Sequence, residues 1–129
     1  DNNGFEPFEE AQIKSLLTLL DRLKKAYSIP TSNFIGDSDI APTRKNDPNW
    51  RFPWKTLSEK GFGYWYDNPS NVTLPNNFNH LQALRIVGFD MKDTTAAIAG
   101  FKRHWLQDTT RGLNTGQLKV LYQLSKKYQ

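Results

Sequence analysis

Residues 36–54 read GDSDIAPTRKNDPNWRFPW, a segment that places three aspartates among prolines and basic side chains. The prolines and the many polar side chains of residues 37–52 predict a loop. Carboxylates favour hard cations such as calcium, magnesium and manganese, so Asp37 and Asp47 could share such an ion with water. Taken as isolated charges, these side chains favour a solvated cluster of ion pairs around a proline-stiffened turn.

Three further elements are predicted around this loop. Residues 33–35 predict a short strand that leads into it, and residues 53–60 predict a short helix after it, with Gly61 just beyond the helix end. A longer helix is predicted over residues 8–27, because apolar side chains recur there at steps of three and four residues. Its apolar stripe consists of Ile13, Leu16, Leu17, Leu20, Leu23 and Tyr27.

The long helix has too few predicted neighbours to form a complete domain. Residues 28–66 supply one short strand and one short helix, whereas a helix of this kind normally lies against a sheet. Residues 1–66 are therefore predicted to be the back half of an α/β domain whose front half is missing. We expect the stripe to be covered by a missing segment, by another chain, or by the rest of this chain folding back.

The second half of the chain has a different pattern. Residues 67–77, rich in asparagine and proline, predict a linker. Residues 78–129 predict a small bundle of three helices. Their apolar faces are Phe78, Leu81, Leu84 and Val87; Ala97, Ile98, Phe101 and Trp105; and Leu118, Leu121, Leu124 and Tyr128. The second and third helices have candidate capping residues, which are Asp93 or Thr94 and Asn114 or Thr115.

The composition excludes several classes of protein. Apolar residues make up 37% and charged residues 23% of the chain, which is typical of a globular protein. No apolar run approaches the roughly 20 residues that a transmembrane helix needs. The chain has no cysteine, so it can form neither disulfides nor thiolate metal sites.

The net charge of +4 is unevenly placed. Residues 67–129 hold eight Lys and Arg against four Asp, whereas the two signs balance in residues 1–66. A basic second half could attract a polyanion such as a nucleic acid, an acidic membrane surface or a cell-wall polymer, or it could be a solvated helical surface. Because no helix face carries a cluster of Lys and Arg, we do not expect a nucleic-acid partner.

The string SDIAPTRKNDP at residues 38–48, followed by FPW at 52–54 and by Leu57 and Gly61, carries a resemblance to a known family. It resembles the end of the catalytic domain of zinc-dependent N-acetylmuramoyl-L-alanine amidases, which cut the bond between muramic acid and the first alanine of the stem peptide. DNNG at residues 1–4 and EAQ at 10–12 are similar to the segment after the central catalytic strand of that family. The three-helix peptidoglycan-binding module that often follows is similar to residues 78–129, through Gly88-Phe89-Asp90, Ala97-Ile98, Phe101 and Lys127-Tyr128.

The resemblance implies roles for residues of the loop. In the family, two histidines and one aspartate hold zinc, and the aspartate corresponds to Asp47. Lys45 corresponds to the lysine that stabilises the developing oxyanion, a role that suits a fixed positive charge. Asp37 stands where the second histidine is expected, and the first histidine would precede this chain. Arg44 and Trp50 are expected to contact the substrate.

The resemblance also implies an architecture and a location. The expected fold is mainly α: residues 1–66 are the C-terminal part of an amidase domain, with a long helix, a short strand and a remnant of the metal loop. Residues 67–77 are a linker, and residues 78–129 are a peptidoglycan-binding-like module of three helices. Peptidoglycan is the implied partner, and the periplasm or cell envelope is the implied location.

Two functions stay open. The chain is either part of an amidase whose site is completed by residues outside it, or a non-catalytic peptidoglycan-binding or scaffold protein whose site has decayed. Aspartate reaches less far than histidine, and the only histidines, His80 and His104, lie on separate predicted helices. We therefore expect no tightly bound zinc in this chain and no amidase activity from it alone.

The loop and its aromatic neighbours also have a structural interpretation. Arg44, Lys45, Asp47 and Asp39 could form a solvated cluster of ion pairs around a proline-stiffened turn. Most aromatic side chains between residues 50 and 66 are expected in the core, with Trp50 the most exposed of them.

Overall fold

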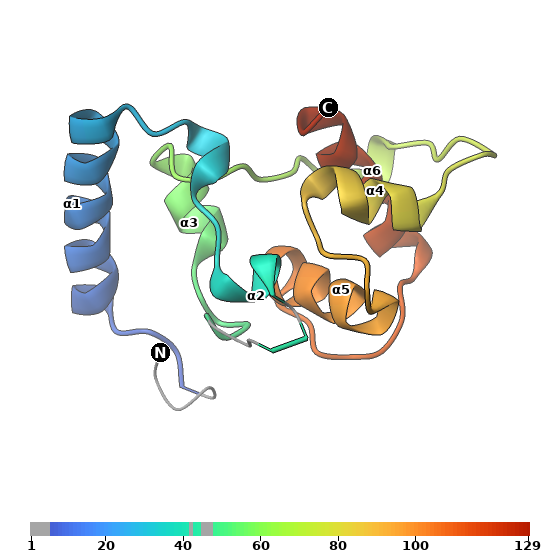
Figure 1. The fold of residues 1–129 in the computed structure, drawn as a ribbon, viewed down its shortest axis with the longest axis horizontal. Coiled ribbons are helices and arrows are strands. Elements are labelled where there is room, and N and C mark those ends of the chain that lie inside the picture. Colours follow the sequence, from blue (N-terminus) through green and yellow to red (C-terminus); the bar gives the residue numbers. More distant parts are fainter. Residues whose placement is uncertain (1–5, 42, 45–47) are drawn as a thin grey trace.

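The computed structural model describes residues 6–41, 43–44 and 48–129, and within these ranges the chain is helical, without a β-strand (Figure 1). The elements are α1 (Glu10–Tyr27), η1 (Thr31–Asn33), α2 (Asp37–Ile40), α3 (Trp54–Glu59), η2 (Pro69–Asn71), α4 (His80–Val87), α5 (Thr94–Phe101), η3 (Lys102–Leu106) and α6 (Thr115–Lys127). Here η1 and η2 are 3₁₀ turns, and η3 is a π-helical turn. The predicted mainly α fold is confirmed. No helix in these ranges is long and apolar enough to cross a membrane.

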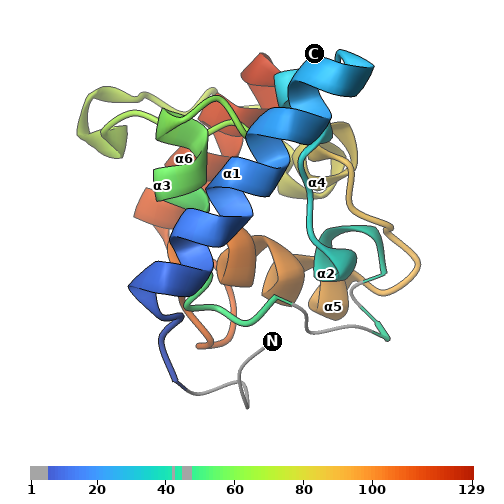
Figure 2. The ribbon, with the colours of Figure 1, turned by 90° about the vertical axis from the view of Figure 1, so that its left-hand side faces the viewer.

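Helix α1 lies at one end of the molecule (Figure 1), and it packs on a small hydrophobic core. Three leucines of its stripe contact three buried side chains of α3 and the turn after it: Leu16, Leu17 and Leu20 against Trp54, Leu57 and Phe62. No residue of α1 is buried, and Leu19 and Leu23 are 53% and 36% exposed. Seen from its own side, α1 lies in front of the rest of the described chain (Figure 2). The rest of the chain therefore covers only part of the stripe.

The short strand predicted for residues 33–35 is wrong. The turn η1 ends at Asn33, and Phe34 and Gly36 then have extended dihedral angles without a paired strand among the described residues. An extended segment becomes a strand only when a neighbouring backbone supplies a ladder of hydrogen bonds. A backbone bond from the Gly63 N–H to the Thr31 carbonyl, at 2.9 Å, lies just before this segment.

The predicted loop over residues 37–52 contains one helical turn, α2, that the sequence pattern did not indicate. The Ala41 N–H donates to the Asp37 carbonyl at 3.0 Å, and Asp39 Oδ2 accepts the Gly36 N–H at 2.7 Å. Aspartate often stabilises such turns through bonds to nearby backbone groups. A single turn is too short to show an apolar period, so α2 could not be predicted in this way.

The other predicted helices are all present. The short helix predicted after the loop is α3, and Gly61 follows it with a φ of +88°. Helices α4, α5 and α6 are capped by Asn79, Asp93 and Asn114, whose side chains accept backbone N–H groups of the first turn. Their apolar faces meet in one core, whose fully covered side chains include Leu84, Phe101, Leu121 and Leu124.

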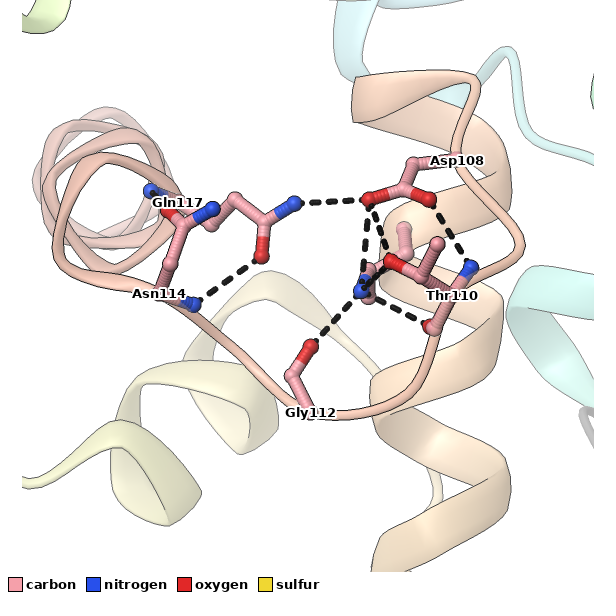
Figure 3. Close-up of polar contacts among 6 residues, drawn as sticks. Asp108, Thr110, Gly112, Asn114 and Gln117 are labelled. Carbon is pink, nitrogen blue, oxygen red and sulfur yellow. Dashed lines mark hydrogen bonds and ion pairs between the residues drawn. The ribbon is translucent and has the colours of Figure 1, made fainter.

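The connection from η3 to α6 is organised by a buried lysine. Lys102 Nζ donates to the Thr110 carbonyl at 2.8 Å, to Thr110 Oγ1 at 2.9 Å and to the Gly112 carbonyl at 2.7 Å. It also lies 3.3 Å from Asp108 Oδ2. Figure 3 shows these acceptors converging from one loop. The buried charge is therefore well compensated.

The two halves of the chain contact each other. Trp65 packs against both hydrophobic cores, and Lys127 Nζ donates to its carbonyl oxygen at 2.6 Å. The side chain of Gln123 bonds both the N–H and the carbonyl of Asp67. Within the predicted linker, η2 packs on α6. The division into domains at residues 67–77 stays a prediction.

Candidate functional site

The candidate site is an open groove at the start of the predicted metal loop. It has a volume of about 520 Å³, and its lining includes Asp37, Pro48 and the aromatic side chains of Phe8, Phe52 and Trp54. Asp37 is exposed. The residue at the expected histidine position is therefore accessible from the groove.

Gly36 allows the two ends of the loop to meet. A Cβ atom at this position would lie 2.6 Å from Pro48 Cδ and 3.1 Å from a ring carbon of Trp54. Any larger residue would push these groups apart, so the close approach requires glycine. Gly36 precedes Asp37 in the sequence and Pro48 follows Asp47, so the chain on either side of the two predicted carboxylates is held together.

Of the other predicted site residues, the structure describes Arg44 and Trp50. Lys45 and Asp47 lie outside the described residues. Arg44 is exposed, and Trp50 is half-buried. The guanidinium carbon of Arg51 lies 4.4 Å from the centroid of the Trp50 ring, in a cation–π contact. That Trp50 is the most exposed of these aromatic side chains stays a prediction.

Asp39 does not belong to a solvated cluster of loop charges. Its side chain is 12% exposed, and Oδ2 lies 2.7 Å from His104 Nδ1 in η3. The His104 ring stacks between Trp54, at 4.0 Å, and Trp105, at 4.2 Å between centroids. His104 is thus a packing residue, and its partner Asp39 was not predicted. The two residues are 65 positions apart, and no sequence motif relates them.

The carboxylate of Asp39 influences ionisable groups of the second half. Burial lowers the pKa of Arg103, and the negative charge of Asp39 opposes part of that shift. Burial, followed by the charges of Asp39 and Tyr64, raises the pKa of Tyr128 to about 12. Asp39 and His104 also line a cavity of about 70 Å³ between α2 and the helices of the second half. The charge of Asp39, in the first half, therefore acts on ionisable side chains of the second half.

The described residues do not by themselves assemble the zinc site that the resemblance implies. Across residues 6–41, 43–44 and 48–129, no three His, Cys, Asp or Glu side chains gather as ligands would. Asp37 supplies one carboxylate at the groove. His104 bonds Asp39, and His80 begins α4 in the other half. The donor set in this part of the chain therefore does not fit a zinc ion.

Comparison with known proteins identifies a relative. No family model matches the chain. The N-acetylmuramoyl-L-alanine amidase AmiD of Escherichia coli is 44% identical over 97 residues, which cover 68% of this chain and 35% of that protein. The chain thus spans about a third of the length of this curated relative.

Two solved structures share the fold. AmiD of E. coli, in complex with the substrate anhydro-N-acetylmuramic acid-L-Ala-D-γ-Glu-L-Lys, matches with a TM-score of 0.78 and 27% identity over 95% of this chain and 54% of that one. AmpDh3 of Pseudomonas aeruginosa, in complex with an anhydromuramic pentapeptide, matches with a TM-score of 0.83 and 30% identity over 99% of this chain and 58% of that one. The chain therefore belongs to the family of N-acetylmuramoyl-L-alanine amidases and matches a part of these longer proteins.

Proposed function

We propose that the chain is the C-terminal portion of an amidase that, when complete, hydrolyses the amide between muramic acid and L-alanine in peptidoglycan. The observation that carries this proposal is the 44% identity to AmiD, together with the ordered string at residues 38–48. The substrate class follows from the muramyl peptides bound by the two solved relatives. The groove beside Asp37 is the surface at which such a peptide would meet the loop.

The complete protein would use zinc, which polarises the scissile carbonyl and activates water. Asp47 is the proposed ligand from this chain, and Asp37 occupies a ligand position with a shorter side chain. Lys45 is the proposed group that stabilises the developing oxyanion, because a fixed positive charge acts most strongly where negative charge appears. Arg44 and Trp50 are proposed to contact the substrate from the edge of the groove.

We also propose how the rest of the protein is arranged. Residues 78–129 would be the peptidoglycan-binding module, joined to residues 1–66 through the linker at 67–77. The exposed part of the α1 stripe, which includes Leu23 and Tyr27, would be covered by the missing half of the catalytic domain or by another chain. The protein would act in the periplasm or elsewhere in the cell envelope, where its substrate lies.

A second function is favoured by one observation. Asp37 stands where the family resemblance places a histidine ligand of zinc, so the chain could derive from an amidase and bind peptidoglycan without cleaving it. The two functions share the fold and the ligand class. They differ in metal content and turnover.

The deciding experiment measures zinc by elemental analysis and amidase activity on purified cell wall. We expect this chain alone to hold no stoichiometric zinc and to release no stem peptide. In a protein restored with the missing catalytic part, Asp37→His should raise zinc affinity because an imidazole replaces a shorter carboxylate. Turnover in the restored wild-type protein would exclude the non-catalytic alternative. Stoichiometric zinc together with turnover in this chain alone would contradict the prediction that its metal site is incomplete.

The role of Lys45 has its own test in the restored protein. Lys45→Ala should lower kcat while leaving zinc content nearly unchanged, because the lysine acts on developing charge and not on the metal. A parallel loss of zinc would show that Lys45 supports the metal site instead.

A further inference from the structure

His104 joins the two halves of the chain beside the candidate groove. It lies in η3, directly after α5, and its side chain is 6% exposed. Its contacts reach back to the first half, to Asp39 in α2 and to Trp54 in α3. A residue of the helical second half is thus built into the base of the loop that carries Asp37.

Asp39 transmits this contact to the backbone of the loop. One carboxylate oxygen, Oδ2, lies 2.7 Å from His104 Nδ1 and accepts the Gly36 N–H at 2.7 Å. An ionised carboxylate can only accept hydrogen bonds, so Nδ1 of His104 must carry the hydrogen. Bonds of this kind are stronger than those between neutral groups. The same oxygen therefore holds the His104 ring and the peptide group just before Asp37.

The histidine ring is held from both faces. The ring of Trp54 is nearly parallel to it, with 6° between the two ring planes. The ring of Trp105 makes the second stacking contact, with 22° between the planes. The π-helical turn that carries His104 is itself a rare local geometry, which is frequently found at functional sites. Trp54 also limits the space at Gly36, since a ring carbon would lie 3.1 Å from a Cβ atom there.

We propose that His104 is a positioning residue: it fixes Asp39 and, through the Gly36 N–H, the backbone that presents Asp37 to the groove. The helical second half is then a structural part of the site, in addition to any wall-binding role. The inference rests on the proposed function only where it treats Asp37 as a residue of the metal site. The clamp, by which we mean the contacts from His104 to Asp39 and from Asp39 to the Gly36 N–H, is a property of this chain.

The test is amide hydrogen exchange measured by NMR on the full chain. His104→Phe keeps a flat ring between the two tryptophans but removes the donor to Asp39. His104→Asn offers an amide N–H near the place of Nδ1, and His80→Asn is the matched control on α4. We expect exchange at Gly36 and Asp37 to become at least about tenfold faster in His104→Phe, and to stay near the wild-type rate in His104→Asn and His80→Asn. Exchange at Leu121, in the core of α6, should not change.

Two results would overturn the proposal. One is an unchanged rate at Gly36 in His104→Phe, and the other is equal acceleration at Leu121, which would make His104 an ordinary core residue. If His104→Phe does not fold, nitrogen NMR of wild-type His104 still decides, because a neutral ring protonated only at Nε2 contradicts the clamp. Neither readout requires zinc or turnover, so failure of the clamp and failure of the amidase proposal are distinguishable.

Discussion

At the scale of single residues, Lys102 shows how a buried charge can organise a loop. Its ammonium group has four oxygen neighbours from Asp108, Thr110 and Gly112, and its side chain is 2% exposed. A lysine is rarely buried unless its donors are satisfied. Figure 3 shows that Gln117 extends this network, because its amide N–H bonds Asp108 while its amide oxygen accepts the Asn114 N–H. The loop and the start of α6 are thus fixed together.

Lys102→Met should destabilise the chain by about 1–3 kcal/mol, because the carbonyls of Thr110 and Gly112 lose their buried donor. Urea unfolding followed by circular dichroism measures the difference. Lys92→Met, at an exposed position, is the matched control and should change stability by less than about 0.5 kcal/mol. Equal effects of the two substitutions would contradict a structural role for the network.

Asp108 makes the stability of the same loop depend on pH. Hydrogen bonds from the backbone and side chain of Thr110, assisted by Lys102 and Gln117, lower the pKa of Asp108 from 3.8 to about 2. A group with a lowered folded-state pKa stabilises the protein above its unfolded pKa and loses that contribution as pH falls through the folded value. Asp108→Asn should therefore be less stable than wild type at pH 6, and the difference should shrink between about pH 4 and pH 2.

The measurement is urea unfolding of both proteins at pH 6 and at pH 2.5. Asp21→Asn is the control, because its salt bridge with Lys25 is exposed and should contribute little. A difference between Asp108→Asn and wild type that does not narrow at low pH would rule out the proposed role of the ionised carboxylate.

At the scale of elements, the sequence predicted those structures that rest on local chemistry. Helices α4, α5 and α6 start where asparagine or aspartate can cap them, and α1 follows its apolar period. The strand predicted at residues 33–35 was wrong, because a strand forms only when a second backbone segment pairs with it, and the local sequence does not show whether one is present. The contact between Asp39 and His104 was not predictable, since it needs the tertiary packing that brings α2 to η3. Lys45 and Asp47 were identified only through the family string.

The start of α6 offers a test of the local chemistry. Asn114 Oδ1 accepts the Gln117 N–H at 2.8 Å, and Gln117 Oε1 accepts the Asn114 N–H at 3.0 Å, which forms a complete capping box. Asn114→Ala should cost about 1 kcal/mol of stability. Asn76→Ala, in the segment before α4, is the control. Thermal unfolding that shifts equally for both variants would show that the cap contributes nothing specific.

At the scale of the whole molecule, the two cores differ in completeness. The core of α4, α5 and α6 contains side chains with no exposed surface, such as Leu84, Leu121 and Leu124. The core under α1 has three buried side chains, and the leucines of α1 only flank them. Full burial of a leucine stabilises by roughly 1.5–3 kcal/mol, so half-covered leucines hold α1 much less firmly. The solved relatives are almost twice as long as the matched region.

Hydrogen exchange measured by mass spectrometry on the chain alone should reveal this difference. Amides of α1 should exchange at least about tenfold faster than those of α6, because opening α1 exposes only half-buried leucines whereas opening α6 exposes a closed core. Within α1, Leu17→Ala should accelerate exchange further, while Leu23→Ala, at an exposed position, should not. In a protein restored with the missing catalytic part, α1 should become as protected as α6. Equal protection of the two helices in the chain alone would mean that the first half is already stable as it stands, and that the exposed face of α1 needs no further segment to cover it.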